Sequence, residues 1–370
     1  MRIAQFIDTE SRGGAERIFI DNCRRLRASG HTPLALHFGS RHLAAECERH
    51  GIRQQIVPGH RQYKKTATLA RFAWQFAGLL REQRIEVLHS HLFGPVTGAA
   101  PAARLAGIPH VGTLHDVYSI GEKPRRIRLL QLAAVLGTRL VAVSRQMEAY
   151  YRSQGRFAAG ALRTIHNGID PLPPTRSRRS VRRLLNLAED EPVVICVGRL
   201  VPLKRHDLLI DAFHRLPGAD RARLLLVGDG PCRERLQRQI AALGLARRVR
   251  LLGARDDVPD LLAAADVFCL SSDTEGLSCS ILEAMAAGLP AVVTAVGGNA
   301  ELVRDGQTGF IVPPGDAATL ALRLEELLGD PLLRQRYAHH ASRRVRSHFS
   351  AAGNLRQYLL LYQGHAEAAA

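Results

Sequence analysis

Residues 1–38 read MRIAQFIDTESRGGAERIFIDNCRRLRASGHTPLALHF, and this stretch contains the pattern that predicts the fold. Two short apolar runs, 3–7 and 33–38, have the composition of buried strands. Between them, an amphipathic segment that opens after Gly13-Gly14 has the pattern of a helix. A strand, a helix and a second strand in this order predict a parallel sheet covered by helices.

The same alternation continues along the chain in two blocks. Further strand-like runs of the first block are 86–91, 110–114, 140–144 and 164–165. Residues 171–180, PLPPTRSRRS, then interrupt the pattern with the Pro, Ser and Arg content of a linker. After the linker, the strand-like runs are 193–197, 223–227, 249–252, 266–270, 291–294 and 309–312. These runs are rich in Val, Ile and Leu, as expected for strands with both faces covered.

We therefore expect an α/β protein with two Rossmann-like domains, residues 1–170 and residues 171–350, each a doubly wound parallel sheet. Residues 331–363 have a helical pattern, and we expect the C-terminal segment 351–370 to pack back on the first domain. Ligands of such sheets bind beyond the carboxyl ends of the strands, so we expect a ligand in a cleft between the two domains.

The composition is that of a globular protein with an excess of positive charge. The chain is 46% hydrophobic and 23% charged, which excludes a disordered protein, a collagen and a disulfide scaffold. The formal net charge is +17, and residues 1–170 contain 25 Lys and Arg against 12 Asp and Glu. A basic first half predicts an anionic partner, which could be a phosphorylated substrate, a membrane surface or a nucleic acid. Solubility alone is the alternative explanation.

The cysteines and the N-terminal residues predict a location in the cytoplasm. None of the six cysteines forms a C-x-x-C pair, and Cys196 and Cys269 lie in apolar runs as buried thiols. Asp8 and Glu10 fall where a signal peptide needs an apolar core. No apolar stretch reaches the roughly 18 residues that a spanning helix needs. We therefore expect a cytoplasmic protein whose membrane contact, if any, is peripheral and on the inner face.

A tryptophan among cations marks a candidate membrane surface in the first domain. In the segment 61–81, Trp74 falls off the apolar helical stripe and shares its face with Lys64, Arg71 and Arg81. This combination suits an anionic membrane or a lipid-linked phosphate acceptor. The alternative is that a neighbouring loop buries Trp74. A second basic cluster, KPRRIR at 123–128, opens another apolar helical stretch.

Two motifs follow strands and are suited to binding an anion. Gly13-Gly14 lets backbone amides approach a phosphate at a helix N-terminus, although such a turn is as often purely structural. The second motif, VGRLVPLK at 197–204, has Arg199 at a strand end and Lys204 at the start of a predicted helix 204–216. Two cations at a strand–helix junction suit a diphosphate, and two unrelated surface cations are the alternative.

The stretch 273–290, DTEGLSCSILEAMAAGLP, contains two carboxylates eight residues apart. Glu275 falls in the loop after a strand and Glu283 on the following helix, at most roughly 12 Å away along the helix axis. Between them, the amides of Gly276, Leu277 and Ser278 can face an anion. One carboxylate can bind sugar hydroxyls and the other ribose hydroxyls, whereas a lone pair at this spacing is usually a solvated helix face.

Several other chemistries are not supported. The sequence LVGDGP at 226–231 has Arg233 where a dinucleotide fingerprint needs its third glycine, so we reject a nicotinamide or flavin site. There is no Asp-x-Asp and no Walker phosphate loop. His89 and His91 place two imidazoles on one strand face without an evident third ligand, and we interpret them as core or cleft residues rather than a metal site.

Taken in order, these motifs resemble the retaining glycosyltransferases of family 4, which have the GT-B fold. The resemblance rests on the Gly13-Gly14 loop, the Arg199 and Lys204 element, and the Glu275 and Glu283 pair. The segment 166–170, HNGID, also resembles this family, as do VGDGP at 227–231 and the glycine pair with its glutamate at 297–301. The resemblance extends over about residues 1–350.

The resemblance implies a role for each matching residue. It implies that Gly13 and Gly14 offer amides to the donor phosphate, and that Arg199 and Lys204 neutralise the leaving nucleoside diphosphate. Glu275 and the amides of 276–278 would hold the donor sugar, and Glu283 the ribose. His115, directly after the strand 110–114, resembles the first-domain histidine beside the anomeric centre. Positions that match the lining of the family's cleft are Ser144 and Asn167.

The resemblance further implies a retaining, metal-independent hexosyl transfer from a UDP- or GDP-sugar. The acceptor would be a saccharide or a lipid-linked saccharide of a surface polysaccharide or glycolipid. Fixed cations and helix amides would stabilise the charge on the leaving diphosphate, and a leaving phosphate oxygen would accept the acceptor's proton. We expect no cofactor. The alternatives are a sugar-nucleotide epimerase or hydrolase on the same scaffold and, with little support, a nucleic-acid-binding protein.

Overall fold

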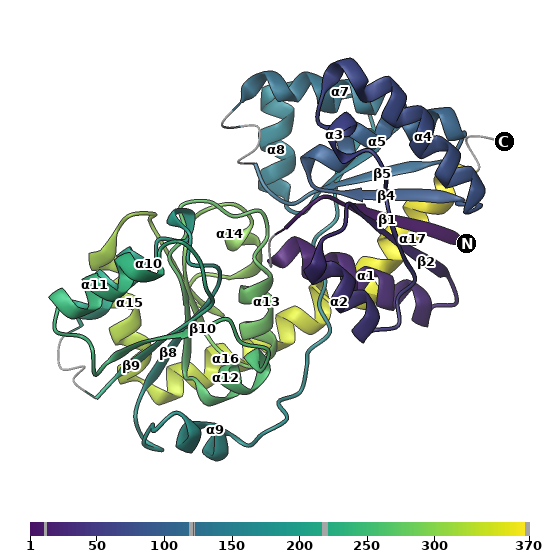
Figure 1. Ribbon diagram of the computed structural model, residues 1–370. Helices are drawn as coiled ribbons and strands as arrows, with labels where there is room; N and C mark the ends of the chain where they lie inside the picture. Colours follow the sequence, from purple (N-terminus) through teal and green to yellow (C-terminus); the bar gives the residue numbers. More distant parts are fainter. Residues whose placement is uncertain (11–12, 118–120, 122, 217–220, 367–370) are drawn as a thin grey trace. The chain divides into compact units, whose positions relative to one another are not determined.

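The computed structural model describes residues 1–10, 13–117, 121, 123–216 and 221–366 of the chain (Figure 1). The described residues form two compact units. Unit 1 comprises Met1–Gly168 together with the residues from Ala352 onward, and unit 2 comprises Ile169–Ala351.

Unit 1 is built on a seven-stranded parallel sheet with the strand order β3-β2-β1-β4-β5-β6-β7. The strands are β1 Arg2–Ile7, β2 Thr32–His37, β3 Gln54–Ile56, β4 Val87–His91, β5 His110–Leu114, β6 Arg139–Ala142 and β7 Leu162–Thr164. The helices are α1 Gly14–Ala28, α2 Arg41–Arg49, α3 His60–Tyr63, α4 Leu69–Glu82, α5 Phe93–Ala106, α7 Ile127–Val135, α8 Arg145–Gln154 and α17 Ala351–Ala366. Short 3₁₀ turns are η1 Thr66–Thr68 and η2 Pro124–Arg126.

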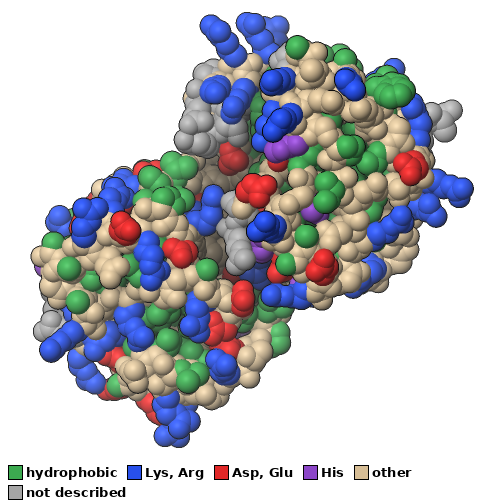
Figure 2. Space-filling view, viewed as in Figure 1, with side chains coloured by type: hydrophobic (Ala, Val, Ile, Leu, Met, Phe, Trp, Pro, Cys, Tyr) green, Lys and Arg blue, Asp and Glu red, His purple; other side chains and the backbone are tan. Residues whose placement is uncertain are grey.

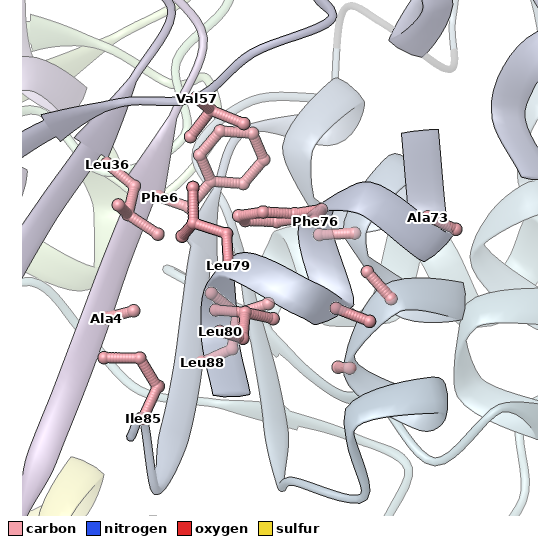
Figure 3. Packing of buried hydrophobic residues seen from close by; sticks show 14 of the residues in the cluster. Ala4, Phe6, Leu36, Val57, Ala73, Phe76, Leu79, Leu80, Ile85 and Leu88 are labelled. Atoms are coloured by element: carbon pink, nitrogen blue, oxygen red, sulfur yellow. The ribbon is translucent and has the colours of Figure 1, made fainter. Parts of the chain in front are cut away.

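Side chains of successive strand residues point to opposite faces, and each face of this sheet is covered by its own helices. Ala4 and Phe6 of β1 pack against α4 and α5, with Phe76 tilted on Phe6 at 5.0 Å between ring centroids (Figure 3). Ile3 and Ile7 point to the other face, which α1, α2 and α17 cover (Figure 1). The C-terminal helix α17 therefore belongs to the core of unit 1.

Unit 2 is built on a six-stranded parallel sheet with the strand order β10-β9-β8-β11-β12-β13. The strands are β8 Val193–Val197, β9 Arg223–Val227, β10 Val249–Gly253, β11 Val267–Leu270, β12 Ala291–Thr294 and β13 Gly309–Val312. The helices are α9 Arg178–Leu184, α10 His206–His214, α11 Arg233–Ala242, α12 Val258–Ala264, α13 Cys279–Ala286, α14 Asn299–Leu302, α15 Ala317–Gly329 and α16 Pro331–His348. A 3₁₀ turn, η3 Pro202–Lys204, precedes α10.

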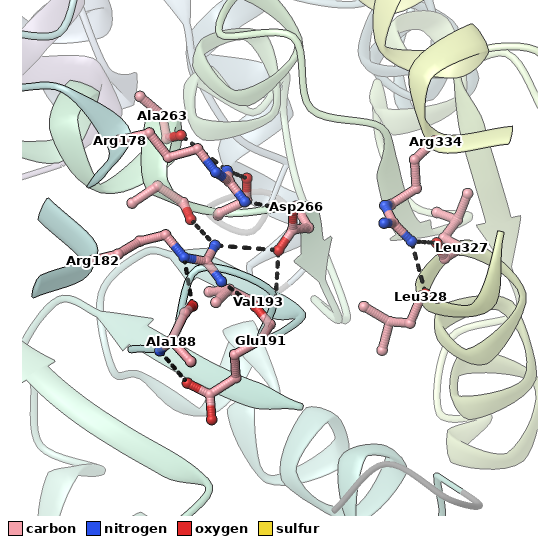
Figure 4. Close-up of polar contacts among 12 residues, drawn as sticks. Arg178, Arg182, Ala188, Glu191, Val193, Ala263, Asp266, Leu327, Leu328 and Arg334 are labelled. Atoms are coloured by element: carbon pink, nitrogen blue, oxygen red, sulfur yellow. Dashed lines mark hydrogen bonds and ion pairs between the residues drawn. The ribbon is translucent and has the colours of Figure 1, made fainter. Parts of the chain in front are cut away.

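The second half of the predicted linker is folded onto unit 2. Helix α9 begins at Arg178, whose guanidinium donates to Asp266 at 2.7 Å. Arg182, on the same helix, is almost fully buried and donates to the carbonyls of Ala188, Ala264 and Glu191 (Figure 4). Arg178, from the predicted linker, and Arg182 therefore hold this helix against the sheet.

Three further local predictions differ from the structure. The edge strand β3 was not predicted, because its sequence, QQI, is polar and its side chains are partly exposed. The helix predicted for 204–216 begins only at His206, because Arg205 adopts a left-handed conformation with φ 46°. The predicted helix 331–363 is interrupted after His348 and resumes at Ala351 as α17. Among the described residues, no helix has the length and apolar character that crossing a bilayer requires.

Candidate functional site

In unit 2, the candidate residues gather where the strand order reverses. The sheet grows from β8 to β9 and β10 in one direction, and from β8 to β11 in the other. Loops that leave two such strands diverge and leave a crevice at the carboxyl edge, where ligands of open α/β sheets bind. The loop after β8 contains Arg199 and Lys204, and the loop after β11 contains Glu275.

Lys204 and Glu275 are in direct contact. The Lys204 ammonium lies 2.5 Å from Oε1 of Glu275, and the side chains are 20% and 9% exposed. The hydroxyl of Ser272 donates to the same carboxylate oxygen at 2.6 Å. The structure therefore brings two residues 71 positions apart in the chain to one point. Arg199 lies two residues beyond β8 and its side chain is exposed.

The loop that carries Lys204 is held by the loop after β11. The Ser271 hydroxyl donates to the carbonyls of Lys204 and Arg205 at 3.2 and 2.7 Å. The backbone amide of Asp273 donates to the carbonyl of Leu203 at 2.9 Å. Lys204 lies in the 3₁₀ turn η3 and not in helix α10. The hydrogen bonds from the loop after β11 fix its backbone.

Two glycines allow the backbone of this region to pack closely. Gly297 has φ +51°, and a Cβ on it would lie 1.9 Å from the carbonyl oxygen of Glu275. Gly228, with φ +139°, would place a Cβ 2.0 Å from the carbonyl oxygen of Gly198. The Gly-x-Gly of 228–230 thus serves the contact with the loop after β8, which gives a structural reason for glycine at that position.

The second half of the motif forms the start of α13. Gly276, Leu277 and Ser278 are buried, and Ser278 is the residue that precedes the first turn. Gly298 donates from its backbone amide to the carbonyl of Gly276 at 2.8 Å, which fixes this loop. Glu283 lies in the second turn of α13 and is half-buried. Backbone amides at a helix N-terminus carry a partial positive charge and favour anions.

In unit 1, the strand order reverses between β1 and β4, and a second group of candidates lies there. Gly13 is the extended residue before α1, and Gly14 is the first residue of that helix. The buried carboxylate of Glu16, in the first turn, accepts a hydrogen bond of 2.5 Å from the hydroxyl of Thr9. Sequence reasoning did not single out Glu16, although an acidic residue in the first turn of a helix is favourable.

His115 follows β5 at the same edge of this sheet. Its Nε2 lies 3.1 Å from Nδ1 of His91. Burial lowers the pKa of His115 to about 4, although the carboxylates of Asp116 and Glu16 act in the opposite direction. His115 is therefore neutral near pH 7. The influence of Glu16 on this pKa indicates that the N-terminus of α1 is near the imidazole.

The two expected cleft residues are both buried. Ser144 precedes α8, and its hydroxyl accepts from the backbone amide of Met147 at 3.2 Å, so it caps that helix. Asn167 lies beyond β7, next to His166, whose carbonyl accepts from Asn354 of α17 at 2.6 Å. The cap gives Ser144 a structural role, and a contact of either residue with a ligand stays a prediction.

Comparison with known sequences decides the family. The family described as Glycosyltransferase Family 4 matches residues 12–171, and Glycosyl transferases group 1 matches residues 177–344. The GDP-mannose-dependent alpha-(1-6)-phosphatidylinositol monomannoside mannosyltransferase of Mycolicibacterium smegmatis is 34% identical over 274 residues, covering 68% of this chain and 70% of the relative. The chain belongs to glycosyltransferase family 4. It is therefore a glycosyltransferase, as the ordered motifs predict.

Two further similarities support the same family and its fold. The N-acetyl-alpha-D-glucosaminyl L-malate synthase of Bacillus anthracis is 28% identical over 296 residues, covering 78% of this chain and 77% of the relative. The crystal structure of Anabaena Alr3699/HepE in complex with UDP-glucose matches with a TM-score of 0.86 and 26% identity. It covers 98% of this chain and 100% of the Anabaena chain. The predicted GT-B fold, with two Rossmann-like domains, is confirmed.

This family 4 glycosyltransferase also carries an exposed basic and apolar surface on unit 1. The helices α4, α5 and α7 pack side by side, and Trp74 of α4 is 71% exposed. Because Trp74 is exposed, the alternative that a neighbouring loop buries it is wrong. Arg71 and Arg81 are also exposed, on the same face of α4. Figure 2 shows Lys and Arg side chains spread over the visible face of unit 1, with hydrophobic side chains exposed among them. Exposed apolar residues of α5 and α7 are Leu105, Leu129, Leu132 and Val135.

Lys64 does not share a helix with Trp74. It follows α3, and its ammonium lies 3.2 Å from Oδ2 of Asp8, directly after β1. The helical periodicity that grouped Lys64 with Trp74 does not apply, because α3 ends at Tyr63 and the 3₁₀ turn η1 separates it from α4. Lys64 lies at the carboxyl edge of the sheet of unit 1, near the expected ligand site.

Proposed function

We propose that this chain is a retaining, metal-independent glycosyltransferase that transfers a hexose from a UDP- or GDP-sugar. The proposed acceptor is a saccharide or a lipid-linked saccharide in surface polysaccharide or glycolipid biosynthesis. The observation that carries the proposal is the contact of Lys204 with Glu275 at the reversal point of the second sheet. In the proposal, this contact joins a cation that binds the diphosphate to a carboxylate that binds the sugar.

The proposed donor site explains how the reaction is promoted. When the sugar leaves as an oxocarbenium-like species, negative charge grows on the nucleoside diphosphate. In the proposal, Arg199 and Lys204 stabilise that charge together with the amides at the start of α13. Glu275 accepts hydrogen bonds from hydroxyls of the transferred sugar, and Glu283 binds the ribose. We propose that these groups provide the charge that a divalent metal provides in other glycosyltransferases.

In unit 1, the residues proposed for contact with substrate are Gly13, Gly14 and His115. Burial lowers the pKa of His115 to about 4, so its imidazole is a weak proton acceptor near pH 7. For this reason we assign the proton transfer to the leaving phosphate: its oxygen accepts the proton of the attacking acceptor hydroxyl on the face from which the sugar leaves.

Names of relatives support the class of donor and acceptor. The Mycolicibacterium relative is named for GDP-mannose and a phosphatidylinositol mannoside, and the Anabaena structure holds UDP-glucose. A lipid-linked acceptor also agrees with the surface formed by α4, α5 and α7. We propose that this surface, with Trp74, Arg71 and Arg81, rests on an anionic bilayer at the inner face of the membrane.

The proposal is tested with the purified full chain in buffer that contains EDTA. UDP-, GDP- and ADP-sugars are screened by thermal shift, and the stabilising donor is then incubated with and without a lipid-linked saccharide. We expect transfer only with acceptor, and an anomeric configuration in the product, read by NMR, equal to that of the donor. Inversion of the anomer refutes the retaining mechanism. Epimerised donor or free sugar formed without acceptor supports the epimerase or hydrolase, and activity only after metal addition refutes metal independence.

A further inference from the structure

Polar side chains lie on one face of three neighbouring strands of unit 1. Gln5 of β1 pairs with His89 of β4, and His91 of β4 pairs with Thr113 of β5. Since side chains two residues apart share a face, these four residues and His115 all point to the side covered by α1 and α17. Buried polar groups in a sheet core destabilise the fold unless they are hydrogen-bonded.

A continuous chain of contacts joins these side chains. His91 contacts His115 through its Nδ1 and Gln5 through its Nε2, which lies 2.8 Å from Oε1 of Gln5. The amide nitrogen of Gln5 lies 3.4 Å from Nδ1 of His89. Nδ1 of His89 also lies 2.6 Å from the Tyr362 hydroxyl, and its Nε2 lies 2.7 Å from Oγ1 of Thr113. The chain thus extends from the edge of the sheet to helix α17.

The orientation of Gln5 sets the direction of the hydrogen bonds. Burial holds the pKa values of His89 and His91 well below the usual range, so both rings are neutral near pH 7. The Gln5 oxygen can only accept, and Nε2 of His91 therefore donates to it. The other nitrogen of His91, Nδ1, then has a lone pair and accepts from Nε2 of His115. This leaves Nδ1 of His115 without a proton.

We propose that His91, oriented by Gln5, is a positioning residue that holds His115 in the Nε2–H tautomer. Nδ1 of His115 then accepts a hydrogen bond from a substrate hydroxyl and has no proton to donate. The inference rests on the proposed substrate contact of His115, but the tautomer itself is a property of the protein without substrate.

Imidazole NMR of the full chain, labelled with ¹⁵N at histidine, tests the tautomer directly. The His115 signals are assigned by their loss in His115→Ala. We expect the Nε2–H pattern in the unaltered protein. In His91→Leu the acceptor is lost, and we expect the His115 signals to shift toward a tautomer mixture. The His91→Asn variant keeps an oxygen near the position of Nδ1, so we expect it to retain the Nε2–H pattern.

Activity measurements separate positioning from folding. For His91→Leu we expect a kcat lower by about tenfold to a hundredfold, the size of effect found when the partner that orients a metal-bound imidazole is removed, with the donor KM within about twofold. We expect His91→Asn to recover most of this loss. His110 is the matched control, because it is a buried histidine bonded to Ser90 and Thr138 on the opposite face of the sheet. We expect His110→Asn to leave the His115 signals unchanged.

An Nδ1–H pattern for His115 in the unaltered protein overturns the inference. So does an unchanged pattern in folded His91→Leu. If His91→Leu fails to fold, His91→Asn decides: loss of the Nε2–H pattern overturns the inference, and its retention supports it. If the tautomer is as expected but no sugar is transferred, the proposed function fails and the positioning role of His91 stands.

Discussion

Replacing Lys204 by Met removes the cation of the proposed diphosphate site and keeps most of the length of the side chain. A hydrogen bond to a charged group contributes about 1.5–3 kcal/mol. Because the Lys204 side chain is partly exposed, we take about 1.5–2 kcal/mol, at the low end of that range. At about 1.4 kcal/mol for each factor of ten, the affinity for UDP or GDP should fall by about 10- to 30-fold.

Replacing Glu275 by Gln should separate the nucleotide from the sugar. The variant keeps the volume of the side chain but loses the charge, so we expect UDP and GDP affinity to change by less than about threefold. The charge-assisted bonds to the donor sugar weaken, so we expect kcat/KM for transfer to fall by about 10- to 100-fold. Because the two residues touch, the effects of Lys204→Met and Glu275→Gln on kcat/KM should not add. We expect the double variant to differ from the sum of the two single effects by about 0.5–3 kcal/mol.

Isothermal titration with UDP and GDP measures the affinities, and initial transfer rates give kcat/KM. Asp273→Asn is the matched control, because it removes the neighbouring ion pair with Arg205, at 3.1 Å, in the same two loops. We expect it to change nucleotide affinity by less than about twofold. Unchanged nucleotide affinity in folded Lys204→Met refutes the diphosphate site. An equal loss of binding and transfer in Glu275→Gln refutes a separate contact with the sugar.

Three further predictions concern stability, the site loop and the membrane. Arg182→Ala leaves buried carbonyls without a donor, so we expect the free energy of unfolding of unit 2, measured in urea, to fall by about 3–5 kcal/mol. Arg179→Ala breaks an exposed ion pair with Glu189 and should change this free energy by less than about 0.5 kcal/mol. Gly297→Ala forces a Cβ against the Glu275 carbonyl, so we expect transfer to fall at least about tenfold. Gly315→Ala has φ +79° but no atom within 4 Å of the added Cβ, so we expect it to lose only about 1–2 kcal/mol of stability. Trp74→Ala should weaken co-sedimentation with anionic vesicles by about tenfold, and equal binding of the unaltered protein to neutral and anionic vesicles contradicts the membrane surface.

Local patterns were sufficient to predict most strands and the order of the motifs. The run predicted at 193–197 coincides with β8, because a buried strand of a parallel sheet is apolar along its whole length. The same apolar periodicity extended the predicted helix two residues beyond the N-terminus of α10. It carries no information about the left-handed Arg205 or about the serine that holds the preceding carbonyls.

The amino-acid sequence alone determined the family, the two α/β domains and the residues that follow each strand, since these depend on composition and spacing along the chain. Only the tertiary structure decided which of those residues meet. The contact of Lys204 with Glu275 exists because β8 and β11 are neighbours in the sheet. The link from His115 to Tyr362 likewise exists because α17 returns to the face of β1 and β4. The order of the strands in each sheet and the packing of α17 on unit 1 depend on contacts between whole elements that are far apart in the sequence. No spacing along the chain specifies them.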